Sequence, residues 1–293
     1  NLLARQFRNQ RTHTLGLIIP ANDYTFSTGF YSQLMLGIGD AASAQHYDLL
    51  ISAQQPGDGE MAAYRRMVAG NRVDAMIVAR TRRNDARIRY LQEQGHTFVV
   101  SGRGAPGETS DYPYIDVDSQ AGICSVVQHF VELGHRDIGL ILPPAELAFT
   151  GYRYEGYCEG LAEAGIPYRP EYVVNGDLLW SGGYQGTQSL LDRHPPLTAI
   201  VACNDLMALG AMSAVQGRGL QVGRDVAVAG FDDITAAEYG YPPLTTVHQP
   251  TYEIGQRLVR LLISIIDGVP PQQTQVLLPG KLVVRASSGF KRT

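Results

Sequence analysis

Two close pairs of aspartates stand out, and carboxylates at such spacing could bind a metal ion or act as an acid and a base. Asp116 and Asp118 form a D-x-D pattern, but no third ligand and no phosphate-binding loop accompany them, so they indicate Mg²⁺ only weakly. Asp232 and Asp233 are adjacent, and adjacent residues at a strand end point in different directions. We therefore expect one of this pair to face a cleft and the other to face the scaffold.

Other motifs of enzyme chemistry are weak or missing. Segment 102–107 reads GRGAPG after a strand-like run, but a dinucleotide fingerprint must open a helix, and Pro106 followed by ETSDYP predicts a loop. The sequence has no P-loop, no G-x-S-x-G and no H-E-x-x-H, and its seven histidines lack metal-ligand spacing. We expect no catalytic residue, no cofactor and no metal, and an enzyme is the less economical interpretation.

Strand-like apolar runs alternate with segments of helical period along the chain. The runs are predicted at 15–19, 47–51, 75–79, 98–100, 138–142, 172–174, 199–202 and 226–229. Helices are predicted near 30–45, 60–69, 85–94, 120–133, 152–164, 182–193, 205–216 and 251–267, and two further strand-like pieces at 274–278 and 282–284. This alternation predicts an α/β fold of two doubly wound lobes, each a parallel sheet covered on both faces.

Glycines help to place the helix ends. Gly95, Gly134, Gly165 and Gly219 each follow a helical stretch, where a left-handed residue that ends a helix is expected. The pair at 37 and 39 lies inside a helical stretch and indicates close packing, and His135 is expected on a surface turn. Ligands of such sheets bind beyond the carboxyl ends of the strands. That rule nominates 20–24, 101–103, 116–118, 143–149, 204–205 and 231–233.

Composition narrows the class of protein. With 293 residues, 44% of them apolar and 18% charged, the chain is typical of a globular protein of about two domains. A net charge of −4 does not mark a DNA-binding domain, so any DNA contact must be confined to a short segment or to residues outside this chain. Three widely spaced cysteines fit a reducing cytoplasm, and no apolar run is long enough to cross a membrane.

Several blocks of the sequence resemble the lactose-repressor (LacI/GalR) family of transcription regulators. They are VACNDLMALGAM at 201–212, GLQVGRDVAVAGFDD at 219–233, PLTTVHQ at 243–249, HFVELGHRDIG at 129–139 and RYEGY at 153–157. The resemblance covers essentially the whole chain, and the blocks are specific when taken together. It implies a type I periplasmic-binding-protein-like fold, with two lobes joined by three crossovers and an effector in the cleft between them.

The same resemblance implies where the lobes divide. The crossovers fall near 117–119, 248–249 and 278, which gives a hinge segment at 1–12, an N-terminal lobe of 13–117 plus 249–278, and a C-terminal lobe of 118–248 plus 279–293. In the family a helix-turn-helix headpiece precedes the hinge, whose short helix forms on operator DNA. The residues expected to contact DNA here are Asn1, Ala4, Arg5 and Phe7, with Phe7 as the minor-groove wedge. The resemblance also implies a homodimer, because palindromic operators mirror a two-fold axis.

The family resemblance also implies effector-binding residues: Arg153, Asn204, Asp232 and the aromatic pair Phe30 and Tyr31. Tyr24 and Phe149 are further candidates for the wall of the site, and Asp118 and Gln249, at the crossovers, could reach either the ligand or the hinge backbone. A sugar or a sugar derivative suits the polar groups of this set, namely the guanidinium of Arg153, the amide of Asn204 and the carboxylate of Asp232. The aromatic pair at 30–31 would also accept a purine. A purely structural role is the alternative for two of these sets. Asn204 could serve as a helix cap, and the aromatic pair could be part of a hydrophobic core.

We therefore expect a ligand-responsive transcription regulator, a repressor of the cytoplasm. In it the effector shifts the population of lobe arrangements and so alters the affinity for operator DNA. The alternative is a periplasmic sugar-binding protein of a transport system, which shares the fold. The hinge-like start and the cysteine count argue against it.

Overall fold

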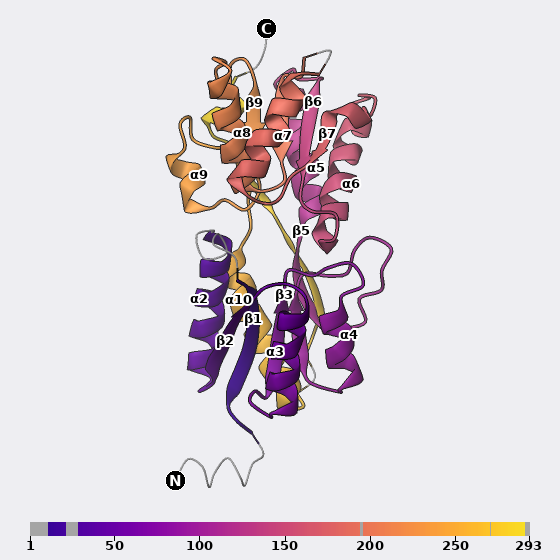
Figure 1. The fold of residues 1–293 in the computed structure, drawn as a ribbon, viewed down its shortest axis with the longest axis vertical. Coiled ribbons are helices and arrows are strands. Elements are labelled where there is room, and N and C mark those ends of the chain that lie inside the picture. The colour runs from indigo at the N-terminus through magenta and orange to yellow at the C-terminus, as the bar shows by residue number, and fades with distance from the viewer. Residues whose placement is uncertain (1–10, 22–28, 194–195, 270, 291–293) are drawn as a thin grey trace. The chain divides into compact units, whose positions relative to one another are not determined.

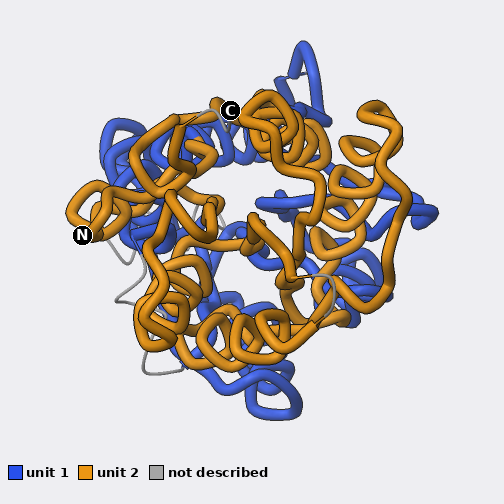
Figure 2. The backbone as a smooth tube through the Cα atoms, turned by 90° about the horizontal axis from the view of Figure 1, so that it is seen from above, with its two compact units in different colours: residues 1–116, 250–277 blue, residues 117–249, 278–293 orange. Residues whose placement is uncertain are grey.

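The protein forms two compact units, which are coloured separately in Figure 2. The computed structural model describes residues 11–21, 29–193, 196–269 and 271–290. Unit 1 comprises Asn1–Asp116 and Pro250–Leu277, and unit 2 comprises Val117–Gln249 and Leu278–Thr293. The chain passes between the units three times, and the observed boundaries each differ by one residue from the lobe boundaries expected from the sequence.

Unit 1 is built on a six-stranded sheet in the order β11-β5-β4-β3-β1-β2. Its strands are β1 (Thr14–Pro20), β2 (Asp48–Gln54), β3 (Ala75–Ala79), β4 (Phe98–Ser101), β5 (Tyr114–Asp118) and β11 (Gln275–Pro279). β1 is parallel to β2 and β3, and β4 is parallel to β3 and β5. All of β3 and nearly all of β1 are buried, which explains why both read as continuous apolar runs.

Helices cover both faces of this sheet (Figure 1): α2 (Gly29–Ala44) and α10 (Thr251–Ile266) lie on one face, and α3 (Asp58–Ala69) and α4 (Ala86–Glu93) on the other. α2 and α10 approach closely, because a Cβ atom at Gly37 would lie 2.1 Å from the carbonyl oxygen of Tyr252. The expected packing role is therefore confirmed for Gly37. It is wrong for Gly39, where a Cβ atom would meet nothing within 4 Å.

Unit 2 is built on a four-stranded parallel sheet in the order β7-β6-β8-β9. Its strands are β6 (Ile138–Leu142), β7 (Val173–Asn175), β8 (Ala199–Ala202) and β9 (Ala227–Ala229). α5 (Ser119–Glu132) packs against α6 (Ala148–Glu163) on one face, and α7 (Trp180–Leu191) packs against α8 (Asp205–Gly217) on the other (Figure 1). The short helix α9 (Thr235–Tyr239) follows β9, and an antiparallel pair of β10 (Thr246–His248) and β12 (Lys281–Val283) completes the unit.

The fold class predicted from the sequence is confirmed, and so are the four glycines at helix ends. Gly95, Gly134, Gly165 and Gly219 all have positive φ, between 59° and 94°. Within the described part of the chain no helix is both long and apolar enough to span a bilayer.

Two further local predictions were wrong, and two short elements were missed. His135 is not on the surface: only 2% of it is exposed, and its Nδ1 lies 2.9 Å from Thr198 Oγ1. Asp116 and Asp118 do not follow a strand but lie within β5, which the sequence did not predict. β10 and α9 were also not predicted, because each is only three to five residues long and shows too little periodicity.

Candidate functional site

Arg153 is the centre of a polar cluster at the carboxyl ends of the strands of unit 2. It belongs to α6 and is 5% exposed. Its guanidinium carbon lies 4.5 Å from the ring centroid of Phe149 and 4.1 Å from that of Phe231. Nη1 donates to the carbonyl oxygen of Cys203, whereas Nη2 lies 3.8 Å from Asp232 Oδ1. Two aromatic faces thus stabilise the buried cation and fix its plane.

The donors of Arg153 are only partly used. Nε is buried and has no hydrogen-bond partner in the described part of the chain, and the contact of Nη2 with Asp232 is too long for a hydrogen bond. Buried donors in folded proteins are nearly always satisfied, so an unpaired Nε on a rigidly held guanidinium calls for an explanation. A ligand oxygen would supply the missing partner.

Asp232 and Asp233 have different partners, as expected for adjacent residues at a strand end. Asp232 has a φ of +128°, and its Oδ1 accepts a 2.6 Å hydrogen bond from Gln249 Nε2. Asp233 instead pairs with Arg285 at 2.8 Å and with His248 at 3.0 Å. These two contacts tie Asp233 into the scaffold, and Asp232 lies beside Arg153.

Asn204 follows β8 and caps α8. Its Oδ1 accepts a 3.0 Å bond from the N–H of Met207, and its Nδ2 donates to the carbonyl oxygen of Leu178 at 2.9 Å. The capping role considered from the sequence is therefore confirmed. Ligand contact by Asn204 stays a prediction: it is 6% exposed, and one N–H of its amide and a second lone pair of its oxygen remain beyond these two bonds.

The other expected effector residues lie in different places. Gln249, which is 8% exposed, and Phe149 belong to the Arg153 cluster. Asp118 caps α5 by accepting a 3.0 Å bond from the N–H of Ala121. Tyr24 and the expected hinge residues Asn1, Ala4, Arg5 and Phe7 lie outside the described residues.

Phe30 and Tyr31 belong to α2 in unit 1. Their rings meet edge to face at 5.5 Å. Tyr31 is fully buried, so the core-filling interpretation holds for this residue, although its hydroxyl has no hydrogen-bond partner in the described part of the chain. Phe30 is half-buried at the start of the helix. Contact of either ring with an effector stays a prediction.

Two members of the cluster were not among the expected effector residues. Phe231, fully buried, forms the second aromatic wall, and the carbonyl oxygen of Cys203 anchors Arg153. The strand-end rule nominated Phe231 within segment 231–233, but no binding role was assigned to it. The carbonyl of Cys203 carried no signal in the sequence, because any residue type supplies a carbonyl.

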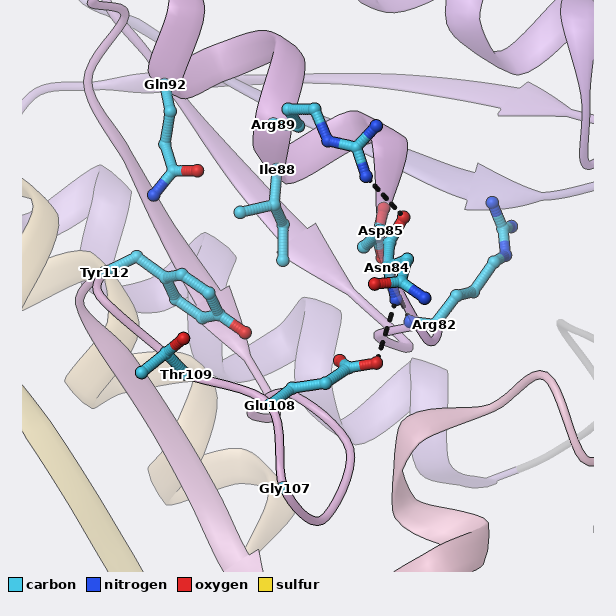
Figure 3. A pocket seen from close by; sticks show the side chains of 10 residues that line it. All are labelled: Arg82, Asn84, Asp85, Ile88, Arg89, Gln92, Gly107, Glu108, Thr109 and Tyr112. Carbon is cyan, nitrogen blue, oxygen red and sulfur yellow. Dashed lines mark hydrogen bonds between the residues drawn. The ribbon is translucent and has the colours of Figure 1, made fainter.

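A separate pocket of about 290 Å³ lies in unit 1, between α4 and the loop that joins β4 to β5 (Figure 3). It is lined by Arg82, Asn84, Asp85, Ile88, Arg89, Gln92, Gly107, Glu108, Thr109 and Tyr112. Several of its charged side chains form hydrogen bonds or ion pairs within the protein. Glu108 accepts 3.1 Å bonds from the N–H groups of Asn84 and Ala105, and Arg82 pairs with Glu60 at 2.7 Å. We therefore interpret this pocket as a product of loop packing.

Beneath the pocket is a buried ionic cluster of Glu60, Asp85 and Arg87. Arg87 is 2% exposed and pairs with Glu60 at 3.0 Å and with Asp85 at 2.6 Å. Although burial opposes ionisation, the hydrogen bonds from Arg87 hold the pKa of Asp85 below its ordinary value. Asp85 also caps α4 through the N–H of Arg87. The cluster joins α3 to the start of α4.

Residues 127–288 match the family model of the periplasmic binding protein-like domain. The chain is 34% identical over 292 residues to the HTH-type transcriptional regulator CelR of Thermobifida fusca, covering 98% of this chain and 84% of the relative. A solved complex of a regulator CelR with cellobiose superposes with a TM-score of 0.89 at 32% identity, covering 97% of this chain and 89% of that one.

Two further solved structures are similar. A regulatory protein of the LacI family from Chloroflexus aggregans has a TM-score of 0.86 at 31% identity, covering 95% of this chain and 99% of that one. The lac repressor dimer bound to operator and an anti-inducer has a TM-score of 0.86 at 26% identity, covering 99% and 98%. These likenesses favour a transcription regulator over a transport protein, and the chain belongs to the LacI family of transcriptional regulators.

Proposed function

We propose that this regulator senses a small neutral sugar through the Arg153 cluster of unit 2, and that it does so without catalysing a reaction. The observation that carries the proposal is the buried guanidinium of Arg153, held between two rings with an unpaired Nε beside the carboxylate of Asp232. A guanidinium next to a carboxylate can bind adjacent hydroxyls of a sugar. The hydroxyl oxygens accept hydrogen bonds from the guanidinium, and the hydroxyl protons are donated to the carboxylate.

The half-buried ring of Phe149 adds an apolar wall. Sugars present C–H faces as well as hydroxyls, and binding sites combine apolar walls with a few oriented polar groups. Because Asp232 and Arg153 stand 3.8 Å apart, a hydroxyl can bond to both without first breaking a short ion pair. These features support a neutral polyol over a ligand of high charge.

Calorimetric titration with cellobiose tests this proposal, because a relative was solved with that sugar. A thermal-shift screen of mono- and disaccharides, sugar phosphates and nucleobases extends the test to other ligands. We expect binding by the wild type and loss of binding in Asp232→Asn. Asp192→Asn serves as control, since Asp192 is an exposed carboxylate of the same unit with an ion pair to Arg218. Binding of nucleobases but no sugar would contradict the proposal.

We further propose that the regulator works as a homodimer in the cytoplasm and binds operator DNA through a headpiece and hinge, with Asn1, Ala4, Arg5 and Phe7 on the DNA. The similarity to the lac repressor dimer on its operator supports this step. Effector binding would change operator affinity about 5–150-fold for a coupling of about 1–3 kcal/mol. Gel-shift titration of the full-length protein with and without sugar measures that factor. A factor of one for every sugar that binds would refute it.

A further inference from the structure

Asp205 is a fully buried carboxyl directly behind the Arg153 cluster. It is the first residue of α8, follows the cap residue Asn204 and is 0% exposed. None of the ion pairs in the described part of the chain includes it. A carboxyl that is buried without a cation depends on its hydrogen bonds, so the groups that bond to it reveal its role.

Both oxygens of Asp205 hold the segment that follows Asp232. Oδ2 accepts a 2.8 Å bond from the N–H of Ile234, and Oδ1 accepts a 2.5 Å bond from the hydroxyl of Thr246, which is also fully buried. Thr246 Oγ1 in turn lies 3.4 Å from the N–H of Asp233. One buried side chain thus fixes two successive backbone amides of the segment, the second through a hydroxyl.

That segment has a conformation that needs to be held. Asp232 has a φ of +128° and Asp233 a φ of +56°, values that L-residues rarely adopt. Such strained residues persist only where their surroundings over-determine them. Gly230 takes part as well, because a Cβ atom at this position would lie 2.2 Å from Asp205 Oδ1 and would block the approach of the carboxyl.

We propose that Asp205 is a positioning residue of the sugar site: it fixes the backbone beyond Asp232 and so holds the carboxylate of Asp232 beside Arg153. This inference deepens the proposed function and rests on it for the identity of the ligand. Asp205 does not touch the sugar. It acts through the direction of Asp232, which an extended backbone without the two positive φ values would turn elsewhere.

The electrostatic surroundings of Asp205 add a pH response. Burial, and then the nearby carboxylate of Asp232, raise its pKa to about 7. The titratable and charged groups around it are Asp232 and Asp233, with Arg153 beside the former and with Arg285 and the imidazole of His248 in contact with the latter. The ionised carboxylate accepts the hydrogen bonds from Ile234 and Thr246 more strongly than the protonated acid does. Sugar affinity should therefore fall as the pH is lowered from 8 to 6.

The variant Asp205→Asn tests the inference, because its amide is uncharged at every pH and mimics the protonated acid. With cellobiose as the probe, we expect the wild type to bind about tenfold more weakly at pH 6 than at pH 8, and the variant to bind at both pH values as the wild type does at pH 6. Asp192→Asn should keep the wild-type profile. His248→Gln should also keep it, which separates Asp205 from the nearby imidazole.

A second measurement needs no sugar. Amide hydrogen exchange at Ile234 should become at least about tenfold faster in Asp205→Ala than in the wild type, with the exchange in β6 and β8 unchanged. Unchanged exchange at Ile234 would overturn the inference whatever the protein binds. Wild-type affinity and pH profile in Asp205→Asn would overturn it equally. Failure of the wild type to bind cellobiose, with faster exchange in Asp205→Ala, counts against the proposed sugar alone and supports the backbone role of Asp205.

Discussion

Replacement of Arg153 by Met should separate ligand binding from folding. Methionine keeps much of the length and apolar volume between Phe149 and Phe231 but removes the charge and all five donors. In this structure the arginine makes one bond to the carbonyl oxygen of Cys203 and one long contact with Asp232, and its Nε has no partner among the described residues. The variant should therefore lose little stability and most of the sugar affinity.

The size of each effect follows from these contacts. Two donors, Nε and Nη2, are available to a ligand, and a hydrogen bond to a charged group contributes about 1.5–3 kcal/mol. Their loss amounts to at least about 3 kcal/mol, or about 150-fold in the dissociation constant. Methionine removes only the cation of this contact, but Asp232 lies 3.8 Å away and keeps its hydrogen bond from Gln249, so the loss stays well below the about 3–5 kcal/mol of breaking a close, fully buried ion pair. The cost of the lost bond to the carbonyl oxygen of Cys203 is partly offset, because a buried charge is no longer desolvated. We expect the free energy of unfolding to change by no more than about 1 kcal/mol.

Titration calorimetry with cellobiose and urea unfolding of the same preparations measure both quantities. Arg218→Met is the matched control, because Arg218 is an exposed arginine of unit 2 that pairs with Asp192. It should keep the wild-type affinity. Wild-type affinity in Arg153→Met would show that the cluster is not the binding site. A loss of stability above about 4 kcal/mol would show instead that Arg153 is mainly structural.

Three further predictions concern stability. Arg87→Met should lower the free energy of unfolding by about 3–5 kcal/mol in urea titrations, because it leaves the buried carboxylate of Asp85 without its cation and leaves Glu60 with Arg82 alone; a loss below about 1 kcal/mol would contradict this. Gly37→Ala should cost about 1–3 kcal/mol by forcing α2 from α10, while Gly39→Ala should gain about 0.5–1 kcal/mol, and equal melting temperatures would refute the difference. Between about pH 4 and 7 the carboxyl of Asp205 is protonated more in the folded protein than in the unfolded chain, because its pKa is raised to about 7. The free energy of unfolding should therefore fall as the pH rises through this range, by at most about 1.4 kcal/mol per pH unit. Urea unfolding of Asp205→Asn should show a flatter fall.

The sequence predicted the fold well because the signal there is repetitive. Parallel strands buried on both faces read as apolar runs, and helices between them read with a period of 3.6 residues, so β1, β3, β6 and β8 were predicted within one or two residues. β5 reads YIDVD, and two acids in alternating positions hid its strand character. Its partly exposed residues alternate with buried ones at the edge where the chain leaves unit 1.

The candidate site was predictable only in part. The strand-end rule alone reached Asn204 and Asp232, because it depends on topology and not on side-chain detail. Arg153 lies inside α6, where an arginine in an amphipathic pattern reads as a solvated residue, and only the family resemblance nominated it. The buried charges of Glu60 and Arg87 escaped for the same reason. Burial of a helical cation depends on segments far away in the sequence, which periodicity does not record.

Asp232 and Asp233 show most clearly what the sequence does not reveal, because two adjacent residues of the same type have different partners in the structure. Asp233 forms a 2.8 Å ion pair with Arg285, and a ligand could reach that carboxylate only by breaking the pair. Asp232 stands 3.8 Å from Arg153, a separation that gains less from Coulomb attraction and leaves the facing donors open. Both aspartates lie in a backbone turn at positive φ that directs their side chains to different arginines, at 3.8 Å and 2.8 Å, and neither aspartate encodes that turn by its type.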